Sequence, residues 1–271
     1  MINYEKLAKY MISEFSKQIR PKYIEYFKCI GFTRDNILNP EVLFKFMAII
    51  SYDMRPLSYE QVWGLTEDHR EFNGNSIRQV LDEIGITLSS VNRMSENELR
   101  QRLKTAFVKN QRFGILYLDK HNHIERQPAY YARLPNVDHA KGLKQLASKI
   151  DKICDMFKKL ELTGDILSIY CSIQNIHGFG RALSAKTILF IVRCFGVGFN
   201  KCNPEDMKKV AYGLFNEYWV KKGIKKLQSK GVDVEVLMDK LTEHGDPFAI
   251  EYLYLLETPE DWQRLFTHAL R

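Results

Sequence analysis

The chain has 271 residues, of which 45% are hydrophobic and 27% are charged, so it is long enough to bury a sizeable core. This composition excludes a disordered, fibrous or membrane-embedded protein. Forty basic and 33 acidic side chains leave a net charge of +7, which favours a polyanionic partner without identifying one.

Cysteine usage and the N-terminal residues bear on the compartment. The five cysteines are odd in number and include no CxxC pair, so we expect free thiols in a reducing cytosol. The first residues carry charge where a signal peptide needs an apolar stretch, and no apolar run approaches the roughly 18 residues of a membrane span. The sequence therefore predicts a soluble, cytoplasmic protein with no membrane association.

Apolar residues at helical spacing predict a mainly α-helical fold. Residues 4–30 fit an amphipathic helix interrupted at Pro21, and Pro40 opens an almost wholly apolar helix that we expect in the middle of a core. Helices are also predicted over 58–65, 75–84, 95–109 and 143–160.

A small β-hairpin is predicted over 113–125, where two aliphatic runs flank a polar turn. Asp119, His121 and His123 in this turn have no further ligand at useful spacing, so we expect no metal site. Residues 127–137, which include two prolines, are predicted to form a loop.

The most informative segment runs from residue 166 to residue 210. A helix over 165–175 precedes the string Ile-His-Gly-Phe-Gly at 176–180, and a buried helix is predicted over 182–195. Glycines let the backbone turn and approach a phosphate, and the amides that open the second helix point their dipole at that anion. This pattern indicates a helix-hairpin-helix element that grips DNA backbone, although a G-x-G turn alone is more often plain turn chemistry.

A lysine and an aspartate follow this turn. Lys186 precedes an apolar run in the second helix, and Asp206 comes 20 residues later at the start of the next helix. Taken singly, a lysine near a helix start is usually solvated, and Asp206 stands where Asn203 and Pro204 would open any helix with an acidic first turn. After a hairpin and at this spacing, the two residues match a known catalytic constellation.

That constellation resembles the helix-hairpin-helix DNA glycosylase superfamily, in which a hairpin is followed by a catalytic lysine and then a catalytic aspartate. Lys186 lies six positions after Gly180, further than in most members, and the string 186–190 is similar to one in the archaeal 8-oxoguanine DNA glycosylase branch. Two fainter similarities are at 50–52 followed by Trp63 and at 247–251 followed by Tyr254. Residues 93–150 have no counterpart in that family.

The resemblance implies one glycosylase-like unit over 1–271 with two helical lobes. One lobe spans 31–160 with an insertion near 93–137, and the other combines 1–30 with 161–271. Lys186 is implied to be the nucleophile and Asp206 its carboxylate partner. The implied contacts to the DNA backbone are His177, Gly178, Gly180 and Arg181.

The resemblance also implies a base pocket. Phe190 would stack on the extruded base, Glu251 would contact it, and Tyr254 or Trp63 would close the other side. The family's pocket tryptophan is replaced here by Tyr254 or Leu255, and its acidic residue is Glu instead of Asp. Further lysines would either hold phosphates or form a solvated face: Lys208, Lys209, Lys221, Lys222, Lys225 and Lys226.

We therefore expect a monomeric DNA glycosylase that flips a damaged, 8-oxoguanine-like base out of double-stranded DNA and excises it, without a metal or cofactor. A Schiff base on Lys186 would add AP-lyase activity. Two alternatives stay open: a glycosylase that removes hypermodified bases from phage DNA in antiviral defence, and a non-enzymatic protein that uses the hairpin only as a phosphate clamp. The sequence does not identify the excised base.

Overall fold

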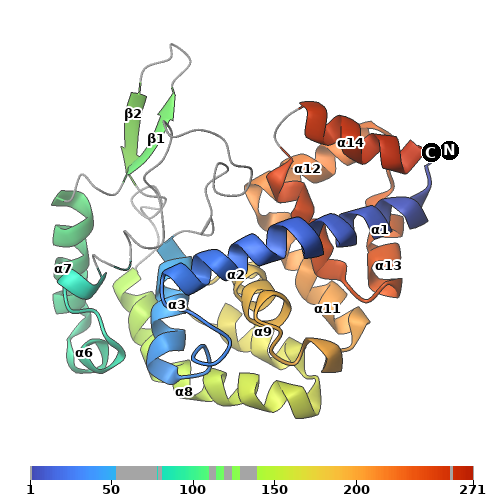
Figure 1. The fold of residues 1–271 in the computed structure, drawn as a ribbon. Coiled ribbons are helices and arrows are strands. Elements are labelled where there is room, and N and C mark those ends of the chain that lie inside the picture. The colour runs from blue at the N-terminus through green and yellow to red at the C-terminus, as the bar shows by residue number, and fades with distance from the viewer. Residues whose placement is uncertain are drawn as a thin grey trace. The chain divides into compact units, whose positions relative to one another are not determined.

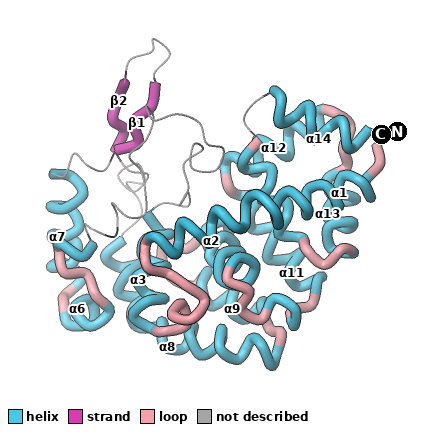
Figure 2. The backbone as a smooth tube through the Cα atoms, in the orientation of Figure 1, coloured by secondary structure: helices cyan, strands magenta, loops and turns pink. Residues whose placement is uncertain are grey.

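The computed structural model describes residues 2–52, 78, 81–109, 114–118, 124–128, 139–256 and 259–270. Over these ranges the chain is mainly helical, as predicted (Figures 1 and 2). In the same ranges, no helix combines the length and the apolar character that crossing a membrane requires. Four predictions fall wholly or partly outside the described residues: Trp63, the turn at 119–123, the helix 58–65 and half of the helix 75–84.

The helices up to the central segment are α1 (Tyr4–Glu14), the π-helical turn η1 (Phe15–Ile19), α2 (Arg20–Cys29), α3 (Pro40–Tyr52), α6 (Leu88–Arg93), α7 (Glu96–Lys109) and α8 (His139–Thr163). Those that follow are α9 (Ile166–Gln174), α10 (Arg181–Ile188), the π-helical η3 (Leu189–Cys194), the 3₁₀ turn η4 (Phe199–Lys201), α11 (Pro204–Ala211), the 3₁₀ turn η5 (Tyr212–Asn216), α12 (Tyr218–Ser229), α13 (Val234–Glu243), the 3₁₀ segment η6 (Pro247–Leu255) and α14 (Pro259–Leu270).

The predicted hairpin is present. Strand β1 (Gly114–Leu118) pairs antiparallel with β2 (Ile124–Pro128), with Gly114 opposite Pro128 and Leu118 opposite Ile124. The second strand runs to Pro128, so residues 127 and 128 are strand where a loop was predicted, and the rest of the predicted loop at 129–137 lies outside the described residues.

The N-terminal helical stretch is not broken at Pro21, contrary to the prediction. A proline removes one helical N–H and its ring crowds the carbonyl four residues earlier. Here the chain widens into η1 just before the proline, and the Arg20 N–H bonds to the Phe15 carbonyl, five residues back. The wider turn lets helical structure continue into α2.

The chain divides into two compact units. Unit 1 comprises Met1–Ile24, Lys159–Cys171 and Arg181–Arg271, and unit 2 comprises Glu25–Lys158 and Ser172–Gly180. The division differs from the expected lobes chiefly at 25–30 and 172–180, which belong to unit 2.

Unit 1 is built around α10 and η3, in which every residue from 183 to 194 is buried. In this unit α1 lies along α13 and α14 (Figure 1). The turn η5 approaches α10 closely: a Cβ at Gly213 would lie 2.7 Å from the Ala185 Cβ and 2.4 Å from the Tyr170 hydroxyl. A larger residue at position 213 would therefore push η5 off the central helix.

Unit 2 has α3 in its core, where Leu43, Phe44 and Met47 are fully buried as the apolar pattern predicts. The short helix α6 was not predicted. Its start is fixed by a capping box in which the Thr87 and Ser90 side chains each bond to the other's backbone N–H.

Candidate functional site

Lys186 lies on the second turn of α10, and its side chain is fully buried, with 0% exposure. Its Nζ donates a hydrogen bond to Glu251 Oε1 on η6, which makes a buried ion pair. Taking an ammonium out of water is costly unless a counter-charge and hydrogen bonds compensate for the lost hydration. The ordinary interpretation of this residue as a solvated lysine near a helix start is therefore wrong.

Aromatic rings surround the Lys186 ammonium. Its Nζ lies 4.0 Å from the centroid of the Tyr254 ring and 5.7 Å from that of Phe190. The Tyr23 ring meets Phe190 edge-on, with 5.0 Å between centroids. Ring faces attract a cation, and this attraction strengthens in a desolvated site.

Helix geometry explains why these residues share one cluster. Lys186 and Phe190 are four residues apart, one turn along the α10–η3 helix, so both project from the same side. Glu251 and Tyr254 are three residues apart in the 3₁₀ segment η6, where side chains at that spacing eclipse each other. Each segment thus brings two residues of the cluster to one side, and the Lys186–Glu251 ion pair joins the two segments.

Glu251 is the carboxylic acid of the cluster, and its pKa is strongly raised. Burial raises the pKa of Glu251 to about 7 from its ordinary 4.5, with Glu217 raising it further, while Lys186 and Tyr23 act to lower it. Its Oε2 atom is buried and has no hydrogen-bond partner by distance and angle among the described residues. The charge of the Lys186–Glu251 pair therefore changes near neutral pH.

Glu217, a second buried carboxylate of unit 1, was missed by sequence reasoning. It is 4% exposed and directly precedes α12, where its Oε2 accepts a hydrogen bond of 2.8 Å from the Val220 N–H. Its charge raises the pKa of both Glu251 and Tyr23. The only sequence signal at Glu217 was its position as an acid just before an amphipathic helix. Many helices begin with an acid, so this position did not mark Glu217 as a site residue.

Asp206 has a different environment from the one expected. It lies in the first turn of α11, is partly exposed and forms an ion pair of 2.8 Å with Lys209. Asn203 caps this helix by accepting a hydrogen bond from the Glu205 N–H at 2.8 Å. The structure thus pairs Lys186 with Glu251 in place of Asp206, because a buried ammonium is matched by a buried carboxylate and Asp206 stays at a wet helix start.

The turn between α9 and α10 is exposed at Gly178, Gly180 and Arg181. Gly178 has a φ of +87°, a conformation that only glycine adopts readily, and a Cβ at Gly180 would meet nothing within 4 Å. The His177 N–H donates to Gln145 Oε1 at 2.7 Å, which ties the turn to α8. A small cavity of about 10 Å³ beneath it has room for about one water molecule, too little for a base.

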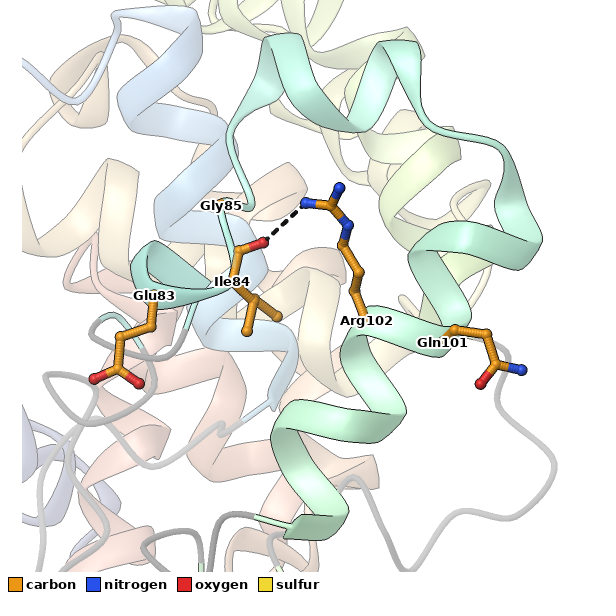
Figure 3. A pocket seen from close by; sticks show the side chains of 5 residues that line it. All are labelled: Glu83, Ile84, Gly85, Gln101 and Arg102. Atoms are coloured by element: carbon orange, nitrogen blue, oxygen red, sulfur yellow. Dashed lines mark hydrogen bonds between the residues drawn. The ribbon is translucent and has the colours of Figure 1, made fainter.

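A larger pocket belongs to unit 2 (Figure 3). It has a volume of about 560 Å³ and is lined by Glu83, Ile84, Gly85, Gln101 and Arg102. The Arg102 Nη1 donates a hydrogen bond to the Ile84 carbonyl at 3.3 Å, so the guanidinium binds to the backbone of the pocket lining. Nothing among these side chains makes a nucleophile with an adjacent base, and the Lys186 cluster lies in the other unit.

Unit 1 also contains a second buried ion pair. The Arg193 Nε donates to Asp246 Oδ2 at 2.7 Å, and its Nη2 donates to the Ser16 hydroxyl, also at 2.7 Å. The guanidinium lies over the rings of Phe15 and Phe199, at 5.4 and 4.9 Å. Burial raises the pKa of Asp246, and Arg193 acts to lower it.

The chain matches no family model, no curated protein and no solved structure. In the part of the chain that the structure describes, no three His, Cys, Asp or Glu side chains gather in a metal-binding arrangement. What the Lys186 cluster offers chemically is a buried amine, a buried carboxylate and aromatic rings in one place.

Proposed function

We propose that this protein is a DNA glycosylase that extrudes a damaged or modified base and removes it with Lys186 as the amine nucleophile. The observation that carries the proposal is the fully buried Lys186, which pairs with Glu251 between two aromatic rings. The resemblance of the turn and the following helix to helix-hairpin-helix glycosylases supports the same conclusion.

A lysine nucleophile must be neutral to attack. Its ordinary pKa is about 10.4, so the site has to favour the uncharged amine. Burial in general penalises charge, and a lysine side chain has a neutral form that an arginine lacks. The raised pKa of Glu251 supports such a site, because it reflects a high cost of ionisation beside the Lys186 amine.

Base loss leaves positive charge on the sugar, which an ionised carboxylate stabilises. Asp206 was expected in this role, but it is partly exposed and paired with Lys209. Glu217 fits better, since it is buried and its charge acts on Glu251. In our proposal Glu217 stabilises the developing charge and Glu251 contacts the amine and the base.

Phe190 and Tyr254 are the proposed stacking surfaces for the extruded base. Because both rings now face a wholly buried Lys186, a base reaches the amine only after at least one of them moves. Extrusion costs a few kcal/mol, which stacking and hydrogen bonds in the pocket offset.

The test uses duplexes that carry oxidised, deaminated or hypermodified bases. Base release and a borohydride-trapped adduct are measured for the native protein, for Lys186→Gln and for Lys240→Gln, a control at an exposed lysine paired with Glu243. We expect release and trapping with the native protein and the control, and neither with Lys186→Gln.

Each other outcome has a defined meaning. Release of a hypermodified base alone favours the defence enzyme over the repair enzyme. Release of the base without a trapped adduct would exclude a Schiff base on Lys186 and would indicate a glycosylase without lyase activity. DNA binding with no release from any duplex, and equal binding by Lys186→Gln, would overturn the enzyme and favour a phosphate clamp.

A further inference from the structure

Helix α12 carries a dense row of lysines on one exposed face. We call it the α12 lysine face, and it consists of Lys221, Lys222, Lys225 and Lys226. Lys230 follows in the turn after the helix, and no acidic residue occurs between positions 218 and 232. Five positive charges thus lie within ten residues.

Like charges are concentrated on the α12 lysine face. Elsewhere in unit 1, Lys9 forms an ion pair with Glu5 at 2.7 Å and Lys240 forms one with Glu243 at 2.5 Å. On α12, partial burial lowers the pKa of Lys226, and the like charges of Lys222 and Lys230 lower it further. Mutual repulsion of this kind is relieved by a bound polyanion.

The other face of α12 is fixed to the site. Val220, Ile224 and Leu227 are buried, and a Cβ at Gly223 would lie 2.9 Å from the Leu253 Cβ. Leu253 belongs to η6, the segment that also carries Glu251 and Tyr254. The lysine face is therefore held rigidly by the element that forms one wall of the Lys186 cluster.

The start of α12 is fixed to the same site, because Glu217 caps the helix and acts on Glu251. The lysine face thus runs from the cluster outward along one helix. Lys221 and Lys225 are separated by about 6 Å along the axis, comparable to the separation of neighbouring phosphates on one strand. At its far end, the Lys226 Nζ lies 4.3 Å from the Trp262 ring, which steadies that side chain.

We propose that the α12 lysine face binds the sugar-phosphate backbone of duplex DNA beside the extruded nucleotide. This inference rests on the proposed glycosylase function and adds a surface to it. Such contacts fix the orientation of the duplex and carry no sequence information. A membrane surface is disfavoured, because a membrane-binding helix inserts apolar side chains and Val220, Ile224 and Leu227 are buried in the protein.

The test compares two doubly substituted proteins with the same change in charge. Lys221→Gln/Lys225→Gln removes two charges from the lysine face, and Lys9→Gln/Lys240→Gln removes two from ion-paired sites. Affinity for an undamaged duplex is measured as a function of salt. We expect the slope of log K against log salt to lose about 1 per lysine, or about 2 in total, for the α12 variant only. We also expect base release at saturating DNA to be unchanged.

Thermal unfolding shows whether the α12 variant folds, and we expect no change since both lysines are exposed. If the native protein binds the duplex and both variants keep its slope, the lysine face is not a DNA contact, while the proposed function stands. If the native protein neither binds duplex DNA nor releases any base, the proposed function itself fails. Binding to vesicles of anionic lipid with no binding to the duplex would overturn the assignment of the partner.

Discussion

The two buried ion pairs of unit 1 lie on the same two elements but are built differently. Lys186 and Arg193 are both on the helix formed by α10 and η3, and their acids, Glu251 and Asp246, stand on η6 and just before it. Arg193 uses two nitrogens, bonds Ser16 as well, and cannot lose its proton. Lys186 has one carboxylate oxygen and two ring faces.

We infer from this difference that the Arg193 pair is structural, and we propose that the Lys186 pair is reactive. The guanidinium of Arg193 donates hydrogen bonds to two fixed acceptors, Asp246 Oδ2 and the Ser16 hydroxyl, and has no accessible neutral form, so it stabilises the fold and supplies no nucleophile. The Lys186 ammonium becomes a nucleophile when it loses one proton, and its partner titrates near neutral pH. Burial alone would not have distinguished the two.

The largest effect is expected for Asp246→Asn. The change leaves the Arg193 guanidinium buried without a counter-charge and unable to become neutral. We expect a loss of about 3–5 kcal/mol in the free energy of unfolding, measured in urea. A loss below about 1 kcal/mol would show that this pair is no more structural than a surface ion pair.

Glu251→Gln should cost less, about 2–3 kcal/mol at neutral pH, because a lysine, unlike an arginine, has a neutral form. The pH dependence of stability should also change. In the native protein, Glu251 has a raised pKa of about 7, so its contribution to stability is present below pH 4.5 and is lost as the pH rises through 7.

In the variant no carboxylate titrates at position 251, so the loss of stability as the pH rises through 7 should disappear. Unfolding in urea at a series of pH values measures both curves. Parallel curves for the native protein and Glu251→Gln would contradict the account of this pair.

The double replacement Lys186→Met/Glu251→Leu should stabilise the fold by about 1–2 kcal/mol while removing all base release. Apolar residues of similar volume avoid the desolvation of both charges. Such a gain would mean that the pair is kept for chemistry at a cost in stability. Unfolding and base release are measured on the same preparation, and a loss of stability would assign the pair to the fold.

Ser16→Ala is the smallest change, at about 1 kcal/mol, because it removes one hydrogen bond to Arg193 and leaves the ion pair in place. Base release should be unaffected. A change in the rate of release with normal stability would mean that the Arg193 cluster takes part in the reaction, which would blur the distinction between the two pairs.

Local pattern predicted most of the helices and the hairpin, because hydrophobic periodicity and cap residues act within a few residues. The π-helical turns escaped prediction, since nothing in the sequence marks where η1 widens the helix before Pro21. The pocket residues suggested by resemblance, Phe190, Glu251 and Tyr254, do lie around Lys186.

The partners of Lys186 show why the rest could not be read from the sequence. Glu251 is 65 residues away, and only the tertiary fold brings it to the amine. Asp206 was the natural local choice, since it follows the hairpin at a familiar spacing, yet the helix-start pattern around it explains its position fully. Glu217 had no local signal that marked it as buried.

In our proposal, Lys186 is the reactive amine of a DNA base-removing enzyme. The most direct measurement traps the native protein with borohydride on a duplex that contains an abasic site, digests the adduct and identifies the modified peptide by mass spectrometry. We expect a single modified lysine, Lys186, and loss of the adduct in Lys186→Gln but not in Lys22→Gln, a control at another unit 1 lysine, whose pKa is lowered by burial. An adduct on Lys22 or on the α12 lysine face, or no adduct at all, would contradict the account.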